Sequence, residues 1–319
     1  MIAATFFDGE EWREGVIDTS GDRMLVRDAT PADHLPRLDG VVTGGFTDHH
    51  VHLQLVDTSG LAASTLGRVL DLGANVTEIA RLGATLSPVR LEYAGAFLTA
   101  PGGYPSDRAW APAGSVREIN DAVQAAEAVA EMADAGARCI KVASNTTAGP
   151  VFGDELIRTI VDLAAAHGLT VTAHAEGPGE AQRIARLGVA RLAHAPFTET
   201  LDDDEIAAQA ASVAWISTLA VHDDATRAVA VENVRRFHAA GGRVLYGTDM
   251  GNGPTPVGAN PVEIAALRDA GLDAAALLRA LAPLDPRDPG ARPLVIPGAP
   301  GTSPDPLRAR PLRPEDLKV

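Results

Sequence analysis

From residue 45 onward, short runs of β-branched residues alternate with longer segments rich in Ala, Leu, Glu and Arg. This alternation predicts strands that each lead into a helix, which is the pattern of parallel α/β proteins. The expected helices include 115–135, 154–167, 179–187 and 224–240. The expected strands are the one around His50 and those at 68–72, 89–97, 137–143, 170–174, 190–194, 213–218 and 244–248. Eight such repeats favour an α/β fold of the (β/α)8 TIM barrel type.

The two ends of the chain have a different pattern. Residues 1–44 contain short strand-like pieces that are broken by turn residues and show no helical period. After Pro283 the chain becomes rich in proline, with Leu294-Val295-Ile296 as one expected strand. We therefore expect a small, truncated β-sandwich domain formed by both termini, residues 1–44 plus 285–319, beside a barrel formed by residues 45–284.

Composition limits the function classes. The chain has 319 residues, of which 46% are hydrophobic and 22% charged, as expected for one large folded core. A net charge of -15 argues against nucleic acid or an anionic membrane surface as a partner, because both require a basic face. Cys139 is the only cysteine, and neither a signal segment nor a long apolar run is present. These features indicate a cytoplasmic protein without a membrane span that acts on small molecules.

Several polar residues lie at the ends of the predicted strands. His50 and His52 are two apart, so on a strand they project to the same face and could hold one cation. Lys141, His174 and His194 end three further strands, and Asp249 follows the last one. Barrels carry their chemistry at the carboxyl ends of the strands, so these six residues together indicate a two-metal hydrolase.

Each residue also has a simpler structural explanation. Lys141 could be a strand-end lysine that reaches solvent, and Asp249 could cap the following helix. His174 and His194 could be buried histidines without a ligand. The combination of all six residues in order is what favours the metal site over these separate explanations.

Three further residues lie in predicted loops at the same end of the barrel. His222 follows the seventh strand and could hydrogen-bond a substrate, and Tyr104 follows the third strand with a phenol that could orient a carbonyl group. Asn145 is a weaker candidate for substrate binding.

A set of motifs occurs in a fixed order between about residue 40 and residue 282. They are Gly45-Phe46-Thr47-Asp48-His49-His50-Val51-His52, Lys141-Val142, Phe152-Gly153-Asp154-Glu155-Leu156, His174-Ala175-Glu176-Gly177, His194 and Gly247-Thr248-Asp249. This set resembles the amidohydrolase superfamily, and within it the branch of prolidases and imidazolonepropionases. The proline that usually precedes Gly-Phe in the first motif is absent, since Thr43-Gly44 stands there.

The resemblance implies a binuclear metal centre. His50 and His52 would bind the more buried ion, His174 and His194 the more exposed ion, and Lys141 would bridge both as a carbamate formed with carbon dioxide. Asp249 would bind the buried ion and act as general base and acid toward a bridging hydroxide. Zinc is the expected metal, although manganese, iron or cobalt would suit the same ligands.

The expected reaction is therefore hydrolysis of a C–N amide or cyclic amide bond in a small molecule such as an N-acyl amino acid or a dipeptide. A lactonase or esterase would use the same metals and is the alternative that the sequence leaves open. A deaminase is less favoured, because that branch usually employs one metal and has no use for Lys141 as a bridge. The expected first unit is short, because only about fifteen residues separate His52 from the second strand. This shortening could create a subunit contact in a homo-oligomer.

Overall fold

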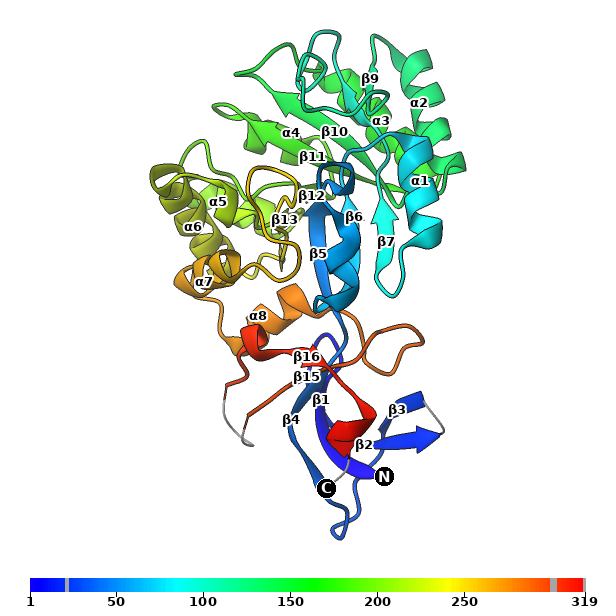
Figure 1. Ribbon diagram of the computed structural model, residues 1–319. Helices are drawn as coiled ribbons and strands as arrows, with labels where there is room; N and C mark the ends of the chain where they lie inside the picture. The colour runs from blue at the N-terminus through cyan, green and yellow to red at the C-terminus, as the bar shows by residue number, and fades with distance from the viewer. Residues whose placement is uncertain (21–22, 299–302, 318–319) are drawn as a thin grey trace.

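The computed structural model describes residues 1–20, 23–298 and 303–317. A small sheet forms the lower part of the molecule and a larger α/β body the upper part (Figure 1). The small sheet, called the terminal sheet below, has the order β16-β15-β4-β1-β2-β3. Its strands are β1 (Ile2–Phe7), β2 (Trp12–Ser20), β3 (Arg23–Asp28), β4 (Arg37–Thr43), β15 (Leu294–Ile296) and β16 (Arg310–Pro311).

Strands from both ends of the chain thus meet in one small unit. β15 pairs antiparallel with β4, and β1 pairs parallel with β4. One face carries its own apolar cluster, which includes Phe6, Ile17, Val42 and Val295. The sequence predicted a β-sandwich, but the strands among the described residues form a single six-stranded sheet.

The upper body contains two parallel sheets. Their orders are β5-β6-β7 and β14-β13-β12-β11-β10-β8-β9. The strands are β5 (Phe46–Val51), β6 (Leu66–Asp71), β7 (Arg90–Tyr93), β8 (Phe97–Thr99), β9 (Val116–Glu118), β10 (Cys139–Asn145), β11 (Thr170–Glu176), β12 (Arg191–Leu192), β13 (Ala214–Ile216) and β14 (Val244–Leu245). Each predicted strand position therefore contains a strand.

The two parallel sheets are joined at both ends. On one side, only residues 94–96 separate β7 from β8, and Gly95 in this link has a φ of 80°. The single strand predicted at 89–97 is divided here, because a glycine with positive φ interrupts extended backbone. On the other side, His49 N donates to Tyr246 O at 3.0 Å, and His52 N donates to Met250 O at 2.7 Å. The resulting ring of strands is consistent with a (β/α)8 barrel.

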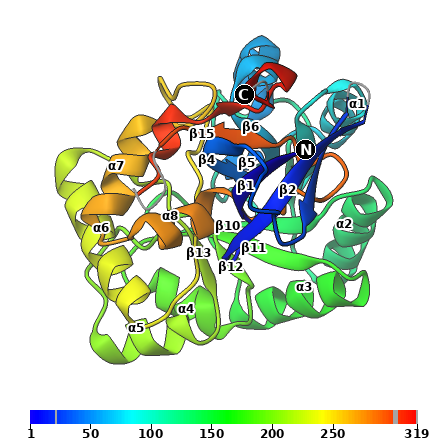
Figure 2. The same ribbon diagram turned by 90° about the horizontal axis from the view of Figure 1, so that it is seen from below.

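Helices cover the outside of these strands, as the view from below shows (Figure 2). They are α1 (Val76–Thr85), α2 (Ala122–Asp134), α3 (Asp154–Ala166), α4 (Glu180–Arg186), α5 (Asp203–Ala210), α6 (Asp224–Ala239), α7 (Pro261–Asp269) and α8 (Ala274–Leu281). The helix predicted from residue 115 begins at Ala122, because the Asp121 side chain caps it by accepting from Val123 N and Gln124 N.

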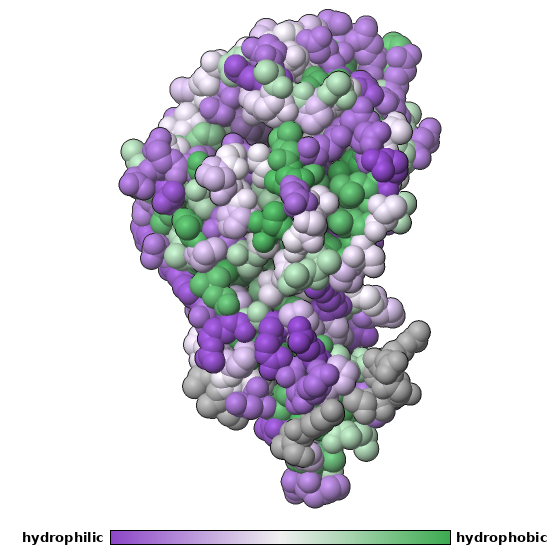
Figure 3. All heavy atoms as spheres, viewed as in Figure 1, coloured by the Kyte–Doolittle hydropathy of each residue, from purple (hydrophilic) through white to green (hydrophobic). Residues whose placement is uncertain are grey.

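The first repeat lacks an α-helix. Two short 3-10 helices, η1 (Leu53–Leu55) and η2 (Thr58–Ala63), connect β5 to β6. This agrees with the short connection in the sequence. On the face shown in Figure 3, hydrophilic side chains cover much of the outer helices, and hydrophobic ones gather in patches across the middle of the upper body. No helix in the part of the chain that the structure describes is long and apolar enough to cross a membrane.

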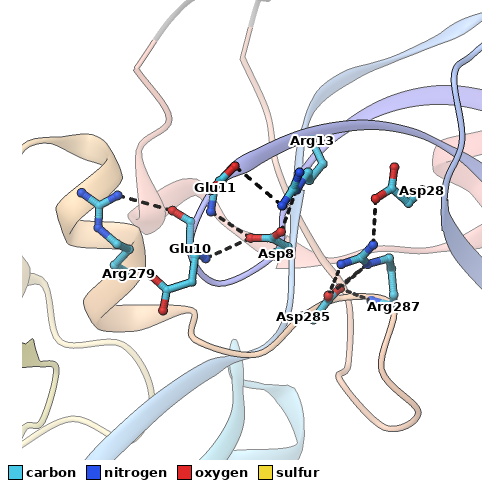
Figure 4. A network of polar contacts seen from close by, with 8 residues as sticks. All are labelled: Asp8, Glu10, Glu11, Arg13, Asp28, Arg279, Asp285 and Arg287. Atoms are coloured by element: carbon cyan, nitrogen blue, oxygen red, sulfur yellow. Dashed lines mark hydrogen bonds and ion pairs between the residues drawn. The ribbon is translucent and has the colours of Figure 1, made fainter.

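A polar network lies where the terminal sheet meets the upper body (Figure 4). Arg279 on α8 donates to the main-chain oxygen of Glu10, at 3.4 Å. Arg287 pairs with Asp28 on β3 at 3.0 Å and also with Asp285. Since these groups are exposed, each ion pair contributes little to stability. The network therefore sets the orientation of the two parts more than their stability.

Glu263 in the first turn of α7 is a fully buried carboxylate. Its Oε2 accepts a hydrogen bond from Ala220 N at 2.6 Å, in η3 (Leu219–Val221), which follows β13. Burial raises the pKa of Glu263 to about 7. The folded state therefore binds a proton on the Glu263 carboxyl group more tightly than the unfolded chain does.

We expect this proton to make the stability depend on pH. The contribution of protonated Glu263 to the free energy of unfolding is fully present below pH 4.5. It is lost as the pH rises through about 7, and the loss is about 3 kcal/mol. The free energy of unfolding of Glu263→Gln should therefore improve relative to the parent protein between pH 5 and pH 8. Chemical denaturation at both pH values measures this, with Glu127→Gln on the exposed face of α2 as the control. Parallel pH profiles for parent and Glu263→Gln would contradict the assignment.

Candidate metal centre

Three ligand atoms meet where β5 approaches the end of β14. Asp249 Oδ1 lies 3.3 Å from His50 Nε2 and 3.2 Å from His52 Nε2. The two Nε2 atoms are 3.3 Å apart. All three side chains are buried, and their ligand atoms lie within 4.8 Å of one another. The structure thus brings together two residues near position 50 and one nearly two hundred residues later.

The two histidines converge in a way that simple strand alternation does not describe. The pairing of β5 with β6 shifts register between Asp48 and Val51, and β5 ends at Val51, before His52. His52 is held instead by its main-chain bond to Met250 O. Asp48 supports the same corner, because its carboxylate accepts from His50 N and from Thr248 N and Oγ1.

Main-chain carbonyl groups fix the protonation of both imidazoles. His50 Nδ1 lies 2.8 Å from Ala193 O, and His52 Nδ1 lies 3.2 Å from Gly73 O. A carbonyl oxygen only accepts, so Nδ1 carries the hydrogen and Nε2 keeps its lone pair for a cation. Burial holds the pKa of His50 well below its usual value, which also favours the neutral ring.

Asp249 is ionised in this setting. Burial opposes its charge, but positive charge on the neighbouring His50 and His52 holds the pKa of Asp249 well below its usual range, and a bound cation would take over this effect from neutral rings. Its Oδ1 is buried and accepts no hydrogen bond from the described residues. Its Oδ2 accepts from Asn252 Nδ2 at 2.8 Å, which orients Oδ1 toward the histidines. A buried, unpartnered carboxylate oxygen beside two imidazole lone pairs is an arrangement that a divalent cation would stabilise.

His174 and His194 form a second pair beside the first. The ring of His194 lies 4.8 Å from that of His50 and 4.8 Å from that of His174. His194 Nδ1 is 2.8 Å from Thr218 Oγ1, so its Nε2 is the nitrogen left for a cation. His174 Nε2 is 2.9 Å from Glu176 Oε2. A carboxylate fixes the hydrogen on Nε2, which leaves Nδ1 as the donor atom of His174.

Lys141 is buried in the barrel with 1% exposure, close enough to these histidines to influence them electrostatically. Burial lowers the pKa of Lys141 to about 8. The sequence placed this residue near a strand end, but β10 continues to Asn145 and pairs with β11 over seven residues. The prediction of the strand end at 143 was therefore wrong by two residues, because the pairing with β11 extends it.

The three candidate substrate residues surround this centre. The ring of Tyr104 lies 5.2 Å from that of His174, and burial, with Asp249 and Glu176 nearby, raises the pKa of Tyr104 well above its usual value. The ring of His222 lies 6.5 Å from that of His194 and 4.4 Å from that of Phe197. Its Nε2 is buried and makes no hydrogen bond among the described residues.

Asn145 contacts the centre through another residue. Its Nδ2 donates to Glu176 Oε2 at 2.7 Å, and its Oδ1 accepts from Thr147 N and Thr147 Oγ1. All of its polar atoms thus have partners within the protein. Glu176 is itself ionised, because its hydrogen bond with His174 lowers its pKa.

Four residues that contact the site have no role that was predicted from the sequence. They are Glu176, Thr218, Asn252 and Trp110. Glu176 could have been found, because it lies two positions after His174 on the same strand. Thr218 and Asn252 lie in loops whose sequence has no periodic pattern of apolar residues. Thr218 and Asp249 both have positive φ, 45° and 52°, which is uncommon for residues other than glycine. Such strain is often found at functional sites.

Comparison with known proteins supports a catalytic site. Residues 41–282 match the sequence profile described as "Amidohydrolase family". No curated protein matches the sequence. Among solved structures, a Xaa-Pro dipeptidase with bound methionine is 16% identical, with a TM-score of 0.70 over 94% of both chains.

Two other solved structures show the same likeness. A prolidase complexed with N-methylphosphonate-L-proline is 18% identical, with a TM-score of 0.64 over 93% of both chains. The ochratoxinase of A. niger is 16% identical, with a TM-score of 0.71 over 94% of this chain and 90% of that one. At these identities the likeness shows a shared fold. Because the family profile spans most of the 319 residues, this chain belongs to the amidohydrolase family of metal-dependent hydrolases that act on carbon–nitrogen bonds.

Proposed function

We propose that this protein is a binuclear hydrolase that cleaves the C–N bond of an amide or cyclic amide in a small molecule. The observation that carries the proposal is the unpartnered Asp249 Oδ1 between the Nε2 atoms of His50 and His52. Three converging buried ligand atoms, one of them a carboxylate oxygen that accepts no hydrogen bond from the described residues, fit a cation. Two imidazoles and a carboxylate suit zinc and similar ions.

The remaining donors support a second ion. His174 offers Nδ1 and His194 offers Nε2, because their other nitrogens contact Glu176 and Thr218. Lys141, if carboxylated by carbon dioxide, would supply an anionic group between the two pairs. Without carboxylation a buried ammonium beside two cations would be strongly unfavourable. This supports Lys141 as the bridging residue.

When bound, the two ions would supply a water of lowered pKa and polarise the carbonyl of the substrate. Asp249 is placed to accept the proton of that water and to transfer it to the leaving nitrogen. The Asn252 amide keeps the Asp249 carboxylate in one orientation during this transfer. Asp249 is therefore our proposed catalytic acid and base.

Two groups around the centre would contact the substrate. Tyr104 keeps its proton near neutral pH, so its phenol can donate a hydrogen bond to a carbonyl oxygen. His222 has one unpartnered buried nitrogen, and burial lowers the pKa of His222 to about 4, so the ring is neutral. We propose that Tyr104 and His222 contact the substrate directly and that Asn145 acts through Glu176.

The reaction class can be tested with pooled substrates. The zinc-loaded protein in bicarbonate buffer is incubated with N-acyl amino acids, dipeptides, cyclic amides, N-acyl arylamines, lactones and aminated heterocycles, and the masses of the products are followed. Release of a free amine or opening of a cyclic amide supports the proposal. Hydrolysis of lactones alone would indicate an esterase, and loss of ammonia a deaminase.

The Lys141→Ala variant tests the binuclear centre. We expect the parent protein to retain two zinc ions after gel filtration and the variant to retain at most one, because the bridging group is lost. Elemental analysis of both proteins measures this, and His167→Ala, at the exposed end of α3, is the control. Two zinc ions in Lys141→Ala would refute the bridging role.

The Asp249→Asn variant tests proton transfer. The amide has the same shape but accepts no proton, so the rate of amide hydrolysis should fall by at least about 100-fold. Amine release by the zinc-loaded variant is compared with that by Asp269→Asn, a substitution at the exposed end of α7. Retention of more than a tenth of the parent rate would exclude Asp249 as the general base.

A further inference from the structure

A small cavity of about 210 Å³ opens beside the metal centre, on the Asp249 side. We call it the amine pocket. Its size is below the ~300–1,000 Å³ of sites that hold drug-sized ligands, so it has room for about one ring. Its lining residues are His52, Leu55, Tyr104, Trp110, Asp249, Gly251, Asn252 and Gly253.

The position of Asp249 decides which half of the substrate enters this pocket. In the proposed reaction, water adds its oxygen to the carbonyl carbon and the C–N bond breaks. The Asp249 carboxylate carries a proton from water to the nitrogen, so the products are a carboxylic acid and an amine. The nitrogen must therefore lie within reach of Asp249. This inference rests on the proposed function, and it places the leaving amine in the amine pocket.

Aromatic rings form one wall of the pocket. The Trp110 ring lies 6.0 Å from that of Tyr104, 6.5 Å from that of His52 and 6.2 Å from that of Phe97. Trp110 nevertheless remains 41% exposed. Its free surface at the mouth of a pocket is available to stack on a flat ligand.

The opposite wall consists partly of backbone. Gly251 has a φ of 110°, and a Cβ there would lie 2.8 Å from His52 O. A side chain at this position would therefore clash with the backbone that carries His52. The glycine therefore allows this loop to approach His52 and Leu55 closely at the edge of the pocket.

The charges around the pocket disfavour a carboxylate on the amine half. No lysine or arginine is among its lining residues. The Arg227 guanidinium donates to the main-chain oxygens of Leu219, Ala220 and His222. It is therefore committed to its own loop.

Arg108 is the remaining cation to consider. Its guanidinium carbon lies 5.7 Å from the centre of the Tyr104 ring, and it forms an ion pair with Asp107 at 3.4 Å. It is not among the residues that line the amine pocket. A carboxylate on the side of the ring away from the metal ions would thus have no lysine or arginine partner among the lining residues, and an unpaired charge there is unfavourable.

We propose that the leaving group of this enzyme is an uncharged aromatic amine about the size of one ring, so that the substrates are N-acyl arylamines. Amino acids are disfavoured as leaving groups, because they would carry a carboxylate into the pocket. This narrows the expectation from the sequence, in which N-acyl amino acids and dipeptides were the examples.

A matched pair of amines tests the proposal without turnover. Binding of 4-toluidine and of 4-aminobenzoate to the zinc-loaded protein is measured by calorimetry. The two amines share the ring and differ in a methyl group against a carboxylate. We expect 4-toluidine to bind at least about 10-fold more tightly, because the carboxylate, opposite the amine on the ring, finds no lysine or arginine among the lining residues. Equal binding, tighter binding of 4-aminobenzoate or no binding of either amine would overturn the proposal.

Two tryptophans with similar exposure provide matched variants. Trp110→Ala should weaken 4-toluidine binding by about 10-fold through loss of the stacking surface. Trp12→Ala should leave the binding unchanged, since Trp12, 39% exposed, lies on β2 of the terminal sheet. Equal effects of both variants would contradict the assigned pocket. Arg108→Leu should not change the ratio between the two amines, and a change that depends on Arg108 would show that this residue binds a carboxylate.

Hydrolysis of the N-acetyl derivatives of the two amines separates this inference from the proposed function. Preferential cleavage of N-acetyl-4-toluidine supports both. Tight binding of 4-toluidine in a protein that hydrolyses none of the pooled amides would support the pocket and count against the amidohydrolase activity. Cleavage of amides by a protein that binds neither amine would support the activity and overturn the pocket.

Discussion

The contact between β5 and the end of β14 is the constraint on which the rest of the structure depends. The main-chain bonds from His49 N to Tyr246 O and from His52 N to Met250 O join the first and last strands of the upper body. They bring His50 and His52 to Asp249 and close the ring of strands in the same step. Because backbone groups make these bonds, the position of the ligands follows from the fold and not from side-chain contacts alone.

The charge state of the centre follows from burial around that contact. Burial keeps His50 and His194 neutral, and carbonyl or hydroxyl groups orient their rings. Asp249 remains ionised against burial only through positive charge beside it, on the facing rings or on a bound cation. The same environment disfavours a charged Lys141. The site thus contains nitrogen lone pairs and one carboxylate close together. A bound cation would stabilise this arrangement.

The sequence predicted the repeat of strands and helices well, because each strand is a compact β-branched run and each helix has a composition of its own. It also predicted that His50 and Asp249 would lie close together, as the structure shows, since polar residues beside predicted strands stand out in apolar surroundings. It did not predict the division at Gly95 or the shift of register in β5, which arise from packing between distant segments. The contacts of Thr218 and Asn252 were not predictable either, because their loops carry no periodic pattern. The single terminal sheet, in place of a sandwich, depends on pairings between the two ends of the chain.

The short passage from β4 to β5 links the terminal sheet to the metal ligands. β4 ends at Thr43 and β5 begins at Phe46, and Gly45 N donates to Ala291 O at 2.7 Å between them. Strand β15, from the far end of the chain, pairs with β4 directly before this link. Along the chain, only Gly44 and Gly45 separate β4 from β5, so a displacement of the terminal sheet would be transmitted directly to the strand that carries His50.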